Sequence, residues 1–404
     1  MAESKHTNLK PATRLVEAGR SPQWTGGAVV NPPIWRASTH LYPDVATQRG
    51  AVKYNEDGQF FYGRRGAPTQ WALAEALTSL ESGADGTVLY PSGVAAIAGA
   101  LLAVLRPGDV LLLADNVYEP SRAMATGMLA DFGIGHRFFD PLDLDAYQAA
   151  FCDKTRAVLL ETPGSLTMEV PDIPAQARIA RERGALSLID NTWASSLGFP
   201  ALEHGCDIAI MSLTKHVGGH SDLMMGSASA REELYGKLRL RAQNLGIVVS
   251  PDDCALALRG LRTLDVRLER QSASALRIAQ WLADCPQVAQ VLCPMLEGAP
   301  GNALWKRDFK GGCGLFSFVF RGGTSEQCDR FVDALELFGI GYSWGGYESL
   351  ALPIRPRNAR TATSWPLPDF EPADQHGVRL AIGLEHADDL IEDLKQAMTK
   401  AGWA

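Results

Sequence analysis

Five short apolar runs separated by helical stretches constrain the fold of this chain more than any other feature. The runs cover residues 87–90, 110–114, 155–160, 186–189 and 207–211. An apolar helical pattern (94–105) and an amphipathic one (173–183) lie between them. Strands that are apolar on both faces are typical of parallel sheets covered by helices on both sides. We therefore predict an α/β fold with a mainly parallel sheet.

The second half of the chain has a different pattern. Helical patterns are expected at 232–244, 252–282, 325–338 and 388–401, and strand patterns at 315–320 and 378–382. The long 252–282 helix is expected to bridge two domains. Because domains usually contain about 100–200 residues, we expect an irregular segment (1–65), a larger α/β domain (66–265) and a smaller α+β domain (266–404) in this 404-residue chain.

The charge balance, the apolar runs and the cysteine content argue against several classes of partner. The chain has 46 acidic and 38 basic residues, and this mild acidic excess argues against a nucleic-acid partner. The longest apolar run, 94–105, is shorter than the ~20 residues that cross a bilayer, so no membrane partner is expected. No CxxC pair occurs among the seven cysteines, and no HExxH is present. Reduced thiols, a cytoplasmic location and no metal site are therefore expected.

Polar residues follow the apolar runs, where ligands bind in open α/β sheets. Ser92 and Gly93 stand between a strand pattern and a helical pattern. Free N–H groups at such a helix start bind phosphate, although serine is also an ordinary helix cap. Asp190 directly follows the 186–189 run and is able to pair with a ring nitrogen, bind a metal or cap the next helix.

A lysine and a tyrosine follow two further runs. Lys215 comes shortly after the 207–211 run, with Ser212 and Thr214 beside it. Burial lowers the pKa of a lysine toward the range useful in catalysis, although a long side chain at a sheet edge also reaches water. Tyr118 follows the 110–114 run and is suited to stacking on a flat ligand or to simple packing.

Each of these four features is ambiguous alone, but together they match one cofactor. Pyridoxal 5′-phosphate (PLP) requires a lysine for its Schiff base, an acid at its pyridine nitrogen and anchors for its phosphate and ring. No GxGxxG after a strand, GxxxxGK[ST] or GxSxG motif occurs, so dinucleotide, P-loop and serine-hydrolase functions lack their signatures. The sequence therefore predicts a PLP enzyme.

The segment 212–222, SLTKHVGGHSD, resembles the cofactor-attachment motif of the Cys/Met-metabolism PLP-dependent enzymes, which have the aspartate-aminotransferase fold (fold type I). The resemblance covers almost the whole chain. Within the family it is strongest to the β-lyases, through the segments 61–66, 118–121, 190–193 and 342–350. His216 departs from the family pattern, in which an aromatic residue or glutamine more often follows the lysine.

This resemblance implies a role for each site residue. Lys215 would be the catalytic lysine, with Tyr118 and Tyr62 as further catalytic residues. Tyr62 and Arg64 would reach the phosphate of a neighbouring subunit from the 1–65 segment, which implies an inter-subunit arm and a homotetramer with shared sites. Arg379 would bind the substrate carboxylate, with Ser343, Trp344 and Tyr118 beside it. The cofactor-binding set would be Lys215, Asp190, Ser92, Gly93, Val94, Tyr118, Ser212, Thr214, Tyr62 and Arg64.

The expected reaction is a β-elimination that cleaves L-cystathionine to homocysteine, pyruvate and ammonia. The resemblance carries this expectation because γ-type relatives typically lack a tryptophan at the position of Trp344. Two alternatives remain open at this stage. The chain could be a γ-lyase, a γ-synthase or a lyase of other cysteine conjugates within the same family. It could also be a regulator that binds PLP without turnover.

Overall fold

The computed structural model describes residues 9–53, 55–355, 360–363 and 376–403. Residues 1–8 and 54 of the predicted arm lie outside the described part. The chain forms two compact units. The first contains residues 1–104, 200–203 and 207–265, and the second contains residues 105–199, 204–206 and 266–404. In the described part of the chain, no helix has the length and apolar character that a bilayer crossing requires.

Three strands form the sheet of the first unit in the order β1-β7-β6. They are β1 (Gly86–Tyr90), β6 (Ile208–Ser212) and β7 (Gly226–Ala230), and both pairs are antiparallel. Tyr90, the last residue of β1, and Ser212, the last residue of β6, both pair with Gly226. The carboxyl ends of β1 and β6 therefore lie at the same edge of this sheet.

Helices cover the strands of the first unit. The apolar helix α5 (Gly93–Val104) packs on β1, β6 and β7, and α10 (Glu232–Asn244) packs on α5, β1 and β7. Helix α4 (Pro68–Leu80) packs on β1 and on α11 (Pro251–Leu261). Because α5 starts only three residues after β1 ends, the strand directs the start of this helix to the edge where β6 also ends.

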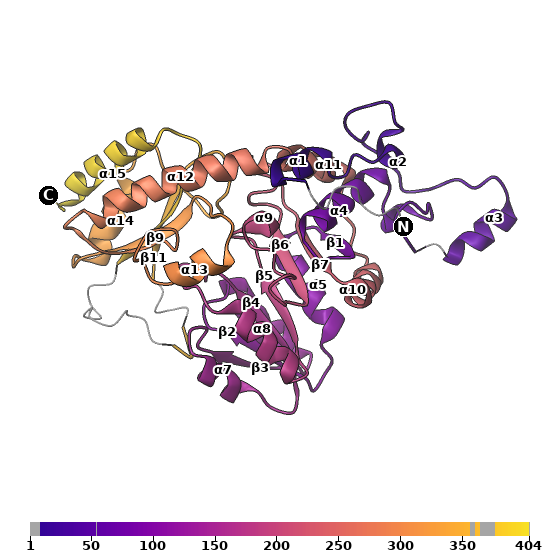
Figure 1. Ribbon diagram of the computed structural model, residues 1–404, viewed down its shortest axis with the longest axis horizontal. Helices are drawn as coiled ribbons and strands as arrows, with labels where there is room; N and C mark the ends of the chain where they lie inside the picture. Colours follow the sequence, from indigo (N-terminus) through magenta and orange to yellow (C-terminus); the bar gives the residue numbers. More distant parts are fainter. Residues whose placement is uncertain (1–8, 54, 356–359, 364–375, 404) are drawn as a thin grey trace. The chain divides into compact units, whose positions relative to one another are not determined.

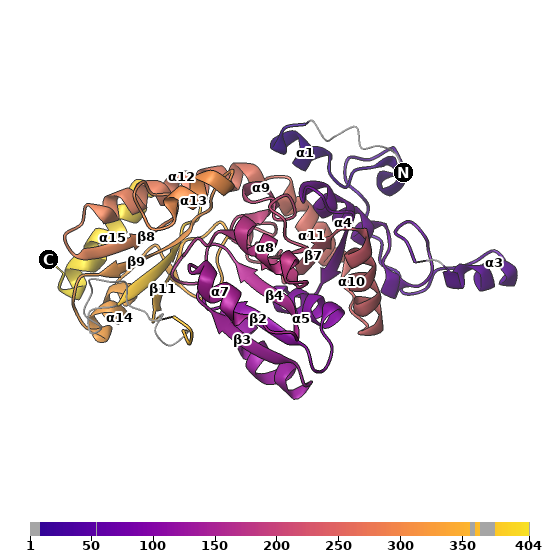
Figure 2. The same cartoon turned by 60° about the horizontal axis from the view of Figure 1, so that its bottom comes forward.

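The first 65 residues are largely irregular, as the sequence predicts. They contain the short helices α1 (Pro11–Glu17), α2 (Pro22–Thr25) and α3 (Val45–Gly50), and the one-turn helices η1 (Ala51–Lys53) and η2 (Gly63–Arg65). Figures 1 and 2 show an extended path of chain that carries α3 away from the strands of its own unit.

Four parallel strands form the first sheet of the second unit, in the order β5-β4-β2-β3. They are β2 (Val110–Ala114), β3 (Gly135–Phe139), β4 (Thr155–Glu161) and β5 (Leu186–Asp190). The helices of this part are α6 (Glu119–Met124), which continues into the π-helical turn η3 (Ala125–Leu129), α7 (Leu144–Ala150), α8 (Ile173–Glu182) and α9 (Ser195–Gly198). Since all four strands run in one direction, the residues that follow them lie along one edge.

A second, mixed sheet completes this unit, with strand order β10-β11-β12-β9-β8. Its strands are β8 (Val288–Leu292), β9 (Leu315–Phe320), β10 (Gly339–Ile340), β11 (Leu350–Ile354) and β12 (Gly377–Ala381). The remaining helices are α12 (Leu264–Ala283), α13 (Asn302–Asp308), α14 (Ser325–Asp333) and α15 (Ala387–Ala401). Helix α14 packs on β11, β12 and α15 (Figure 1). The parallel sheet and this smaller α+β part confirm the predicted fold class.

The predicted 252–282 helix is wrong in one respect, because it is interrupted between α11 and α12. The N–H of Thr263 turns back to the carbonyl of Gly260, and the Arg262 guanidinium donates to the carbonyls of Leu15 and Ala18. A Cβ at Gly260 would lie 2.1 Å from the carbonyl oxygen of Val217. Long-range contacts of this kind end α11 where the local pattern predicts a continuous helix.

Candidate active site

The start of α5 forms an anion cradle in the first unit. Ser92 Oγ accepts the N–H of Ala95 at 3.1 Å, and the Ser92 carbonyl accepts the N–H of Ala96. The N–H groups of Gly93 and Val94, at the first two helical positions, have no acceptor within the helix, and the helix dipole places positive charge there. The structure therefore shows the helix cap at Ser92, and the binding of a phosphate at this helix start stays a prediction.

Glycine is required where this cradle meets the end of β6. A Cβ on Gly93 would lie 2.7 Å from Cβ and 2.8 Å from Oγ of Ser212. A Cβ on Gly226 would lie 2.3 Å from the carbonyl oxygen of Ser92. The Ser212 hydroxyl thus lies beside the free N–H groups of α5, which is the arrangement that a phosphate group needs.

Lys215 is fixed at the same edge by a tight turn after β6. Its N–H donates to the carbonyl of Ser212 at 3.2 Å, and its carbonyl accepts the N–H of Gly219 at 2.8 Å. The side chain is half-buried. Helix α11 supports the turn through the close approach of Gly260 to the carbonyls of Val217 and Gly218. The first unit therefore brings the predicted lysine and the predicted phosphate cradle to one sheet edge.

The hydroxyl of Thr214 contacts the backbone of Met225. Its hydroxyl oxygen lies 3.2 Å from the carbonyl of Met225 and accepts the N–H of Met225 at 3.0 Å. The hydroxyl therefore ties the lysine turn to the residue before β7, and its predicted contact with the phosphate stays a prediction. His216 is buried, whereas His220 is exposed with Nδ1 2.8 Å from the carbonyl of Gly218.

Tyr62 and Arg64 lie at the start of η2, where Tyr62 is 47% exposed. Arg64 donates to the carbonyl of Gln243 at 2.7 Å and lines a pocket together with Arg65, Arg239 and Asp57. Both side chains are thus accessible in the single chain. Their predicted contact with a neighbouring subunit stays a prediction.

In the second unit, Tyr118, Glu161 and Asp190 follow or end three neighbouring strands. Glu161 and Asp190 are register partners at the ends of β4 and β5. The N–H of Tyr118 donates to Oε2 of Glu161 at 2.6 Å. Burial raises the pKa of the Tyr118 hydroxyl, and the nearby charges of Asp190 and Glu161 raise it further. The predicted aromatic residue and the predicted acid therefore lie together.

Thr192 orients the Asp190 carboxylate. Both its N–H, at 3.0 Å, and its hydroxyl donate to the same oxygen, Oδ1. This turn binds one carboxylate oxygen to the backbone that follows β5. A carboxylate held in this way is suited to accept a hydrogen bond from a protonated ring nitrogen.

Sequence reasoning missed Glu161. The apolar run 155–160 ends one residue before β4 does, and the rule that singles out Asp190 applies equally to the residue after this run. Burial raises the pKa of Glu161 well above its ordinary value, and the charge of Asp190 adds to the rise. Two carboxyl groups at register-paired strand ends favour a proton on one of them.

Arg379, in β12, reaches the loop that carries Ser343 and Trp344. Its Nη2 donates to the carbonyl of Ser343 at 3.3 Å, and Ser343 has a φ of 84°, which is unusual for a residue other than glycine. Burial lowers the pKa of Arg379, while nearby Tyr118 and Tyr342 oppose this change. Trp344 is half-buried. The second unit thus places the predicted carboxylate-binding arginine near the predicted stacking tyrosine.

These residues fit the groups of PLP. The first unit provides free N–H groups, a hydroxyl and a lysine at one sheet edge, and a side chain at Gly93 would fill the cradle. The second unit provides an oriented carboxylate, an aromatic ring and a half-buried guanidinium. Among the described residues, no group of three or more His, Cys, Asp or Glu side chains is placed to bind a metal ion.

Comparisons with known proteins agree with this fit. The chain is 42% identical over 385 residues to a cystathionine beta-lyase of Escherichia coli, covering 95% of this chain and 96% of that one. It is 43% identical over 393 residues to a cystathionine beta-lyase of Salmonella typhimurium, covering 96% and 98%. A solved cystathionine gamma synthase from Xanthomonas oryzae superposes with a TM-score of 0.86 at 33% identity, covering 98% of this chain and 99% of that one.

The family comparison covers nearly the whole chain. Residues 12–399 match the family described as "Cys/Met metabolism PLP-dependent enzyme". This range includes every strand and every site residue described above, and the family match confirms the predicted cofactor and enzyme class. The chain belongs to the Cys/Met metabolism PLP-dependent enzyme family.

Proposed function

We propose that this protein is a carbon–sulfur lyase that cleaves the Cβ–S bond of L-cystathionine. Water enters the overall reaction, and the products are homocysteine, pyruvate and ammonia. The observation that carries the proposal is the turn after β6, which fixes Lys215 beside the Gly93–Ser212 cradle. The similarity to curated cystathionine beta-lyases over nearly the full chain supports this choice of substrate.

PLP, when bound, supplies an electron sink that makes the α-proton of the substrate acidic. Ser92, Gly93, Val94, Ser212 and Thr214 would bind the phosphate. Lys215 would hold the cofactor covalently in the resting enzyme. Its freed Nζ amine then takes the proton from Cα of the substrate.

The residues of the second unit orient the cofactor and the substrate and polarise the cofactor ring. The Asp190 carboxylate would hold a proton on the pyridine nitrogen, and the Tyr118 ring would pack on the cofactor ring. Arg379 binds the substrate α-carboxylate, because a planar guanidinium pairs with both carboxylate oxygens. The Cβ–S electron pair leaves with sulfur, a proton completes the homocysteine thiol, and water releases the remaining three-carbon fragment as pyruvate and ammonia.

The purified protein tests this proposal in two steps. Borohydride reduction followed by peptide mapping is expected to place the pyridoxyl group on Lys215, and a pyridoxyl group on another lysine refutes its role. Turnover of L-cystathionine is then expected to yield homocysteine and pyruvate. If cysteine and 2-oxobutyrate are the main products, the protein is a γ-lyase with the same cofactor site.

Trp344 is proposed to favour cleavage at Cβ by limiting where the substrate chain lies. Trp344→Ala is expected to reduce the fraction of pyruvate among the keto-acid products, whereas Trp344→Phe keeps more of it because a ring remains. If both variants release only pyruvate at the wild-type rate, Trp344 has only a packing role.

The active unit is proposed to be a homotetramer in which Tyr62 and Arg64 serve the phosphate of a neighbour, with residues 1–65 as an inter-subunit arm. The exposure of Tyr62 and the outlying path of the chain around α3 support the arm (Figure 2). Mixing Arg64→Ala chains with Lys215→Ala chains is expected to restore activity, since some hybrid sites carry both native residues. Full activity in a verified monomer rules the arrangement out.

The remaining assignments concern domains and location. Residues 66–265 are proposed to form the PLP-binding domain and residues 266–404 the carboxyl-terminal domain. We also propose a cytoplasmic location, because none of the seven cysteines, all of which lie in the described residues, forms a disulfide. Fractionation of cells into cytoplasmic and exported proteins tests the location, and recovery of the active enzyme in the exported fraction contradicts it.

A further inference from the structure

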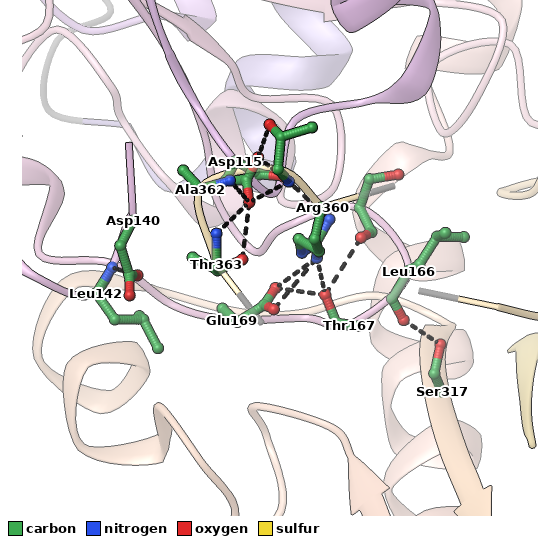
Figure 3. A network of polar contacts seen from close by, with 12 residues as sticks. Asp115, Asp140, Leu142, Leu166, Thr167, Glu169, Ser317, Arg360, Ala362 and Thr363 are labelled. Atoms are coloured by element: carbon green, nitrogen blue, oxygen red, sulfur yellow. Dashed lines mark hydrogen bonds and ion pairs between the residues drawn. The ribbon is translucent and has the colours of Figure 1, made fainter. Parts of the chain in front are cut away.

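The carboxylate of Asp115, directly after β2, is buried inside a set of donors from a segment far away in the sequence. Asp115 is 0% exposed. It accepts the backbone N–H groups of three successive residues: Thr361 at 3.0 Å, Ala362 at 3.0 Å and Thr363 at 2.8 Å (Figure 3). It also accepts the hydroxyl groups of Thr361 at 3.1 Å and Thr363 at 2.8 Å. Three successive N–H groups around one carboxylate form an anion-binding nest, which the chain fills with its own aspartate.

Arg360 extends the same contact to the loop after β4. Its guanidinium donates to the carbonyl of Asp115 at 3.1 Å, to the hydroxyl of Thr167 and to Glu169 at 3.2 Å (Figure 3). The hydroxyl of Thr167 also donates to Glu169 at 2.6 Å. One short segment, Arg360–Thr363, therefore links the loops that follow β2 and β4.

The turn that contains Asp115 also carries Tyr118. Arg122, one helical turn after Tyr118, returns to Asp115 and donates to Oδ1 at 2.8 Å and to the carbonyl at 3.2 Å. It also donates to the Thr361 hydroxyl at 2.9 Å and packs on the ring of Phe138 at 3.9 Å. The Asp115–Arg122 ion pair thus closes the turn, and Tyr118 lies in its middle.

We propose that Asp115 is a positioning residue: by binding Thr361–Thr363 and Arg122, it fixes the turn that presents the Tyr118 ring to the cofactor. This inference rests on the proposed function, in which Tyr118 packs on PLP. A carboxylate is needed because several donors converge on it. Burial alone would raise the pKa of Asp115, but hydrogen bonds from Thr363, Arg122 and Thr361 outweigh burial and lower it.

The test compares holoenzymes by the circular dichroism band of bound PLP and by the rate of PLP release. Asp115→Asn is expected to reduce the band and to speed PLP release about tenfold, the effect of one lost hydrogen bond to a charged group. The pair Thr361→Val and Thr363→Val removes only the hydroxyl donors, and a smaller change in the same direction is expected. If Asp115→Asn does not fold, the variant with both threonine substitutions still tests the positioning role of Asp115.

Asp172→Asn is the matched control. Asp172 also caps a backbone N–H, that of Ala175, and pairs with an arginine, Arg307. Its loss is expected to lower the unfolding temperature and to leave both cofactor readouts unchanged. If Asp115→Asn or the threonine pair behaves like this control, Asp115 is only structural and the proposal is wrong.

A double-mutant cycle distinguishes an effect of Asp115 that is transmitted through Tyr118 from a general loss of order in the structure. If Asp115 acts through Tyr118, Asp115→Asn adds no further change in a Tyr118→Ala background. Additive effects overturn the proposal. Failure of the wild-type protein to attach PLP at Lys215 would instead refute the proposed function, so the two failures are distinguishable.

Discussion

Oε2 of Glu161 accepts the backbone N–H of Tyr118 at 2.6 Å, so the carboxyl group that ends β4 holds the residue that precedes α6. The contact joins two neighbouring parallel strands at the edge where ligands bind. It fixes the backbone of Tyr118, while Asp115 fixes the turn around it. The aromatic residue of the site is thus supported by two acidic side chains that do not themselves need to touch the cofactor.

Substitutions of Glu161 separate its acceptor role from its charge. Glu161→Gln keeps an oxygen acceptor for Tyr118, and we expect PLP release within about threefold of wild type. Glu161→Leu leaves the N–H without its acceptor, which costs about 1–3 kcal/mol, equivalent to a roughly 5- to 150-fold change in an equilibrium constant. PLP dissociation and thermal unfolding measure both variants. Equal losses in the two variants would show that charge, and not the hydrogen bond, is required.

The raised pKa of Glu161 predicts a pH-dependent change in stability. Between the unfolded value of about 4.3 and the raised folded value, the folded protein binds the extra proton, so its stability falls as pH rises through this window. Glutamine does not ionise. The free energy of unfolding of Glu161→Gln relative to wild type is therefore expected to increase as the pH rises above about 4.3. Urea unfolding measures it, and a constant difference across this range contradicts the prediction.

The strand-end rule predicted much of the site because it depends only on local patterns. Lys215 follows an apolar run of the first unit. Asp190 and Tyr118 follow two runs of the second unit, whose parallel strands place the residues after them at one edge. The start of α5 was recognised in the same way from Ser92 and Gly93. The roles of Tyr62 and Arg64, in contrast, came from family resemblance, because exposed residues in an irregular segment leave no periodic signal.

Contacts between distant parts of the sequence could not be predicted from patterns. Asp115 and Thr363 are 248 residues apart, and neither apolar periodicity nor turn composition relates them. The end of α11 has the same origin, since Gly260 meets the lysine turn more than 40 residues earlier in the chain. Strand β3 was missed for a local reason, because its first four residues alternate between exposed and half-buried positions and form no apolar run.

Arg379 offers a test of carboxylate binding. Arg379→Lys keeps the charge but loses the planar pair of donors, so we expect kcat/KM for L-cystathionine to fall about 10- to 100-fold, mostly through KM. The control is Arg277→Lys, because Arg277 forms an exposed ion pair with Asp388. Steady-state kinetics of both variants check the prediction. A fall in kcat with unchanged KM would assign Arg379 to the chemical step instead.

Gly93→Ala tests the phosphate cradle through a single methyl group. Alanine is the better helix former by about 1 kcal/mol, so propensity alone predicts a more stable α5. The added Cβ, however, would lie 2.7 Å from Cβ of Ser212, which forces the helix start and the end of β6 apart. We therefore expect at least about tenfold weaker PLP binding, the result of losing one hydrogen bond to a charged phosphate.

Gly236→Ala is the matched control for this variant. Gly236 lies inside α10, and a Cβ there meets no atom within 4 Å. The substitution is expected to raise the unfolding temperature without changing PLP affinity, measured by titration of the cofactor-free proteins. Wild-type affinity in Gly93→Ala would mean that the cradle tolerates the methyl group. Phosphate binding would then have to rest on groups other than the close contact between Gly93 and Ser212.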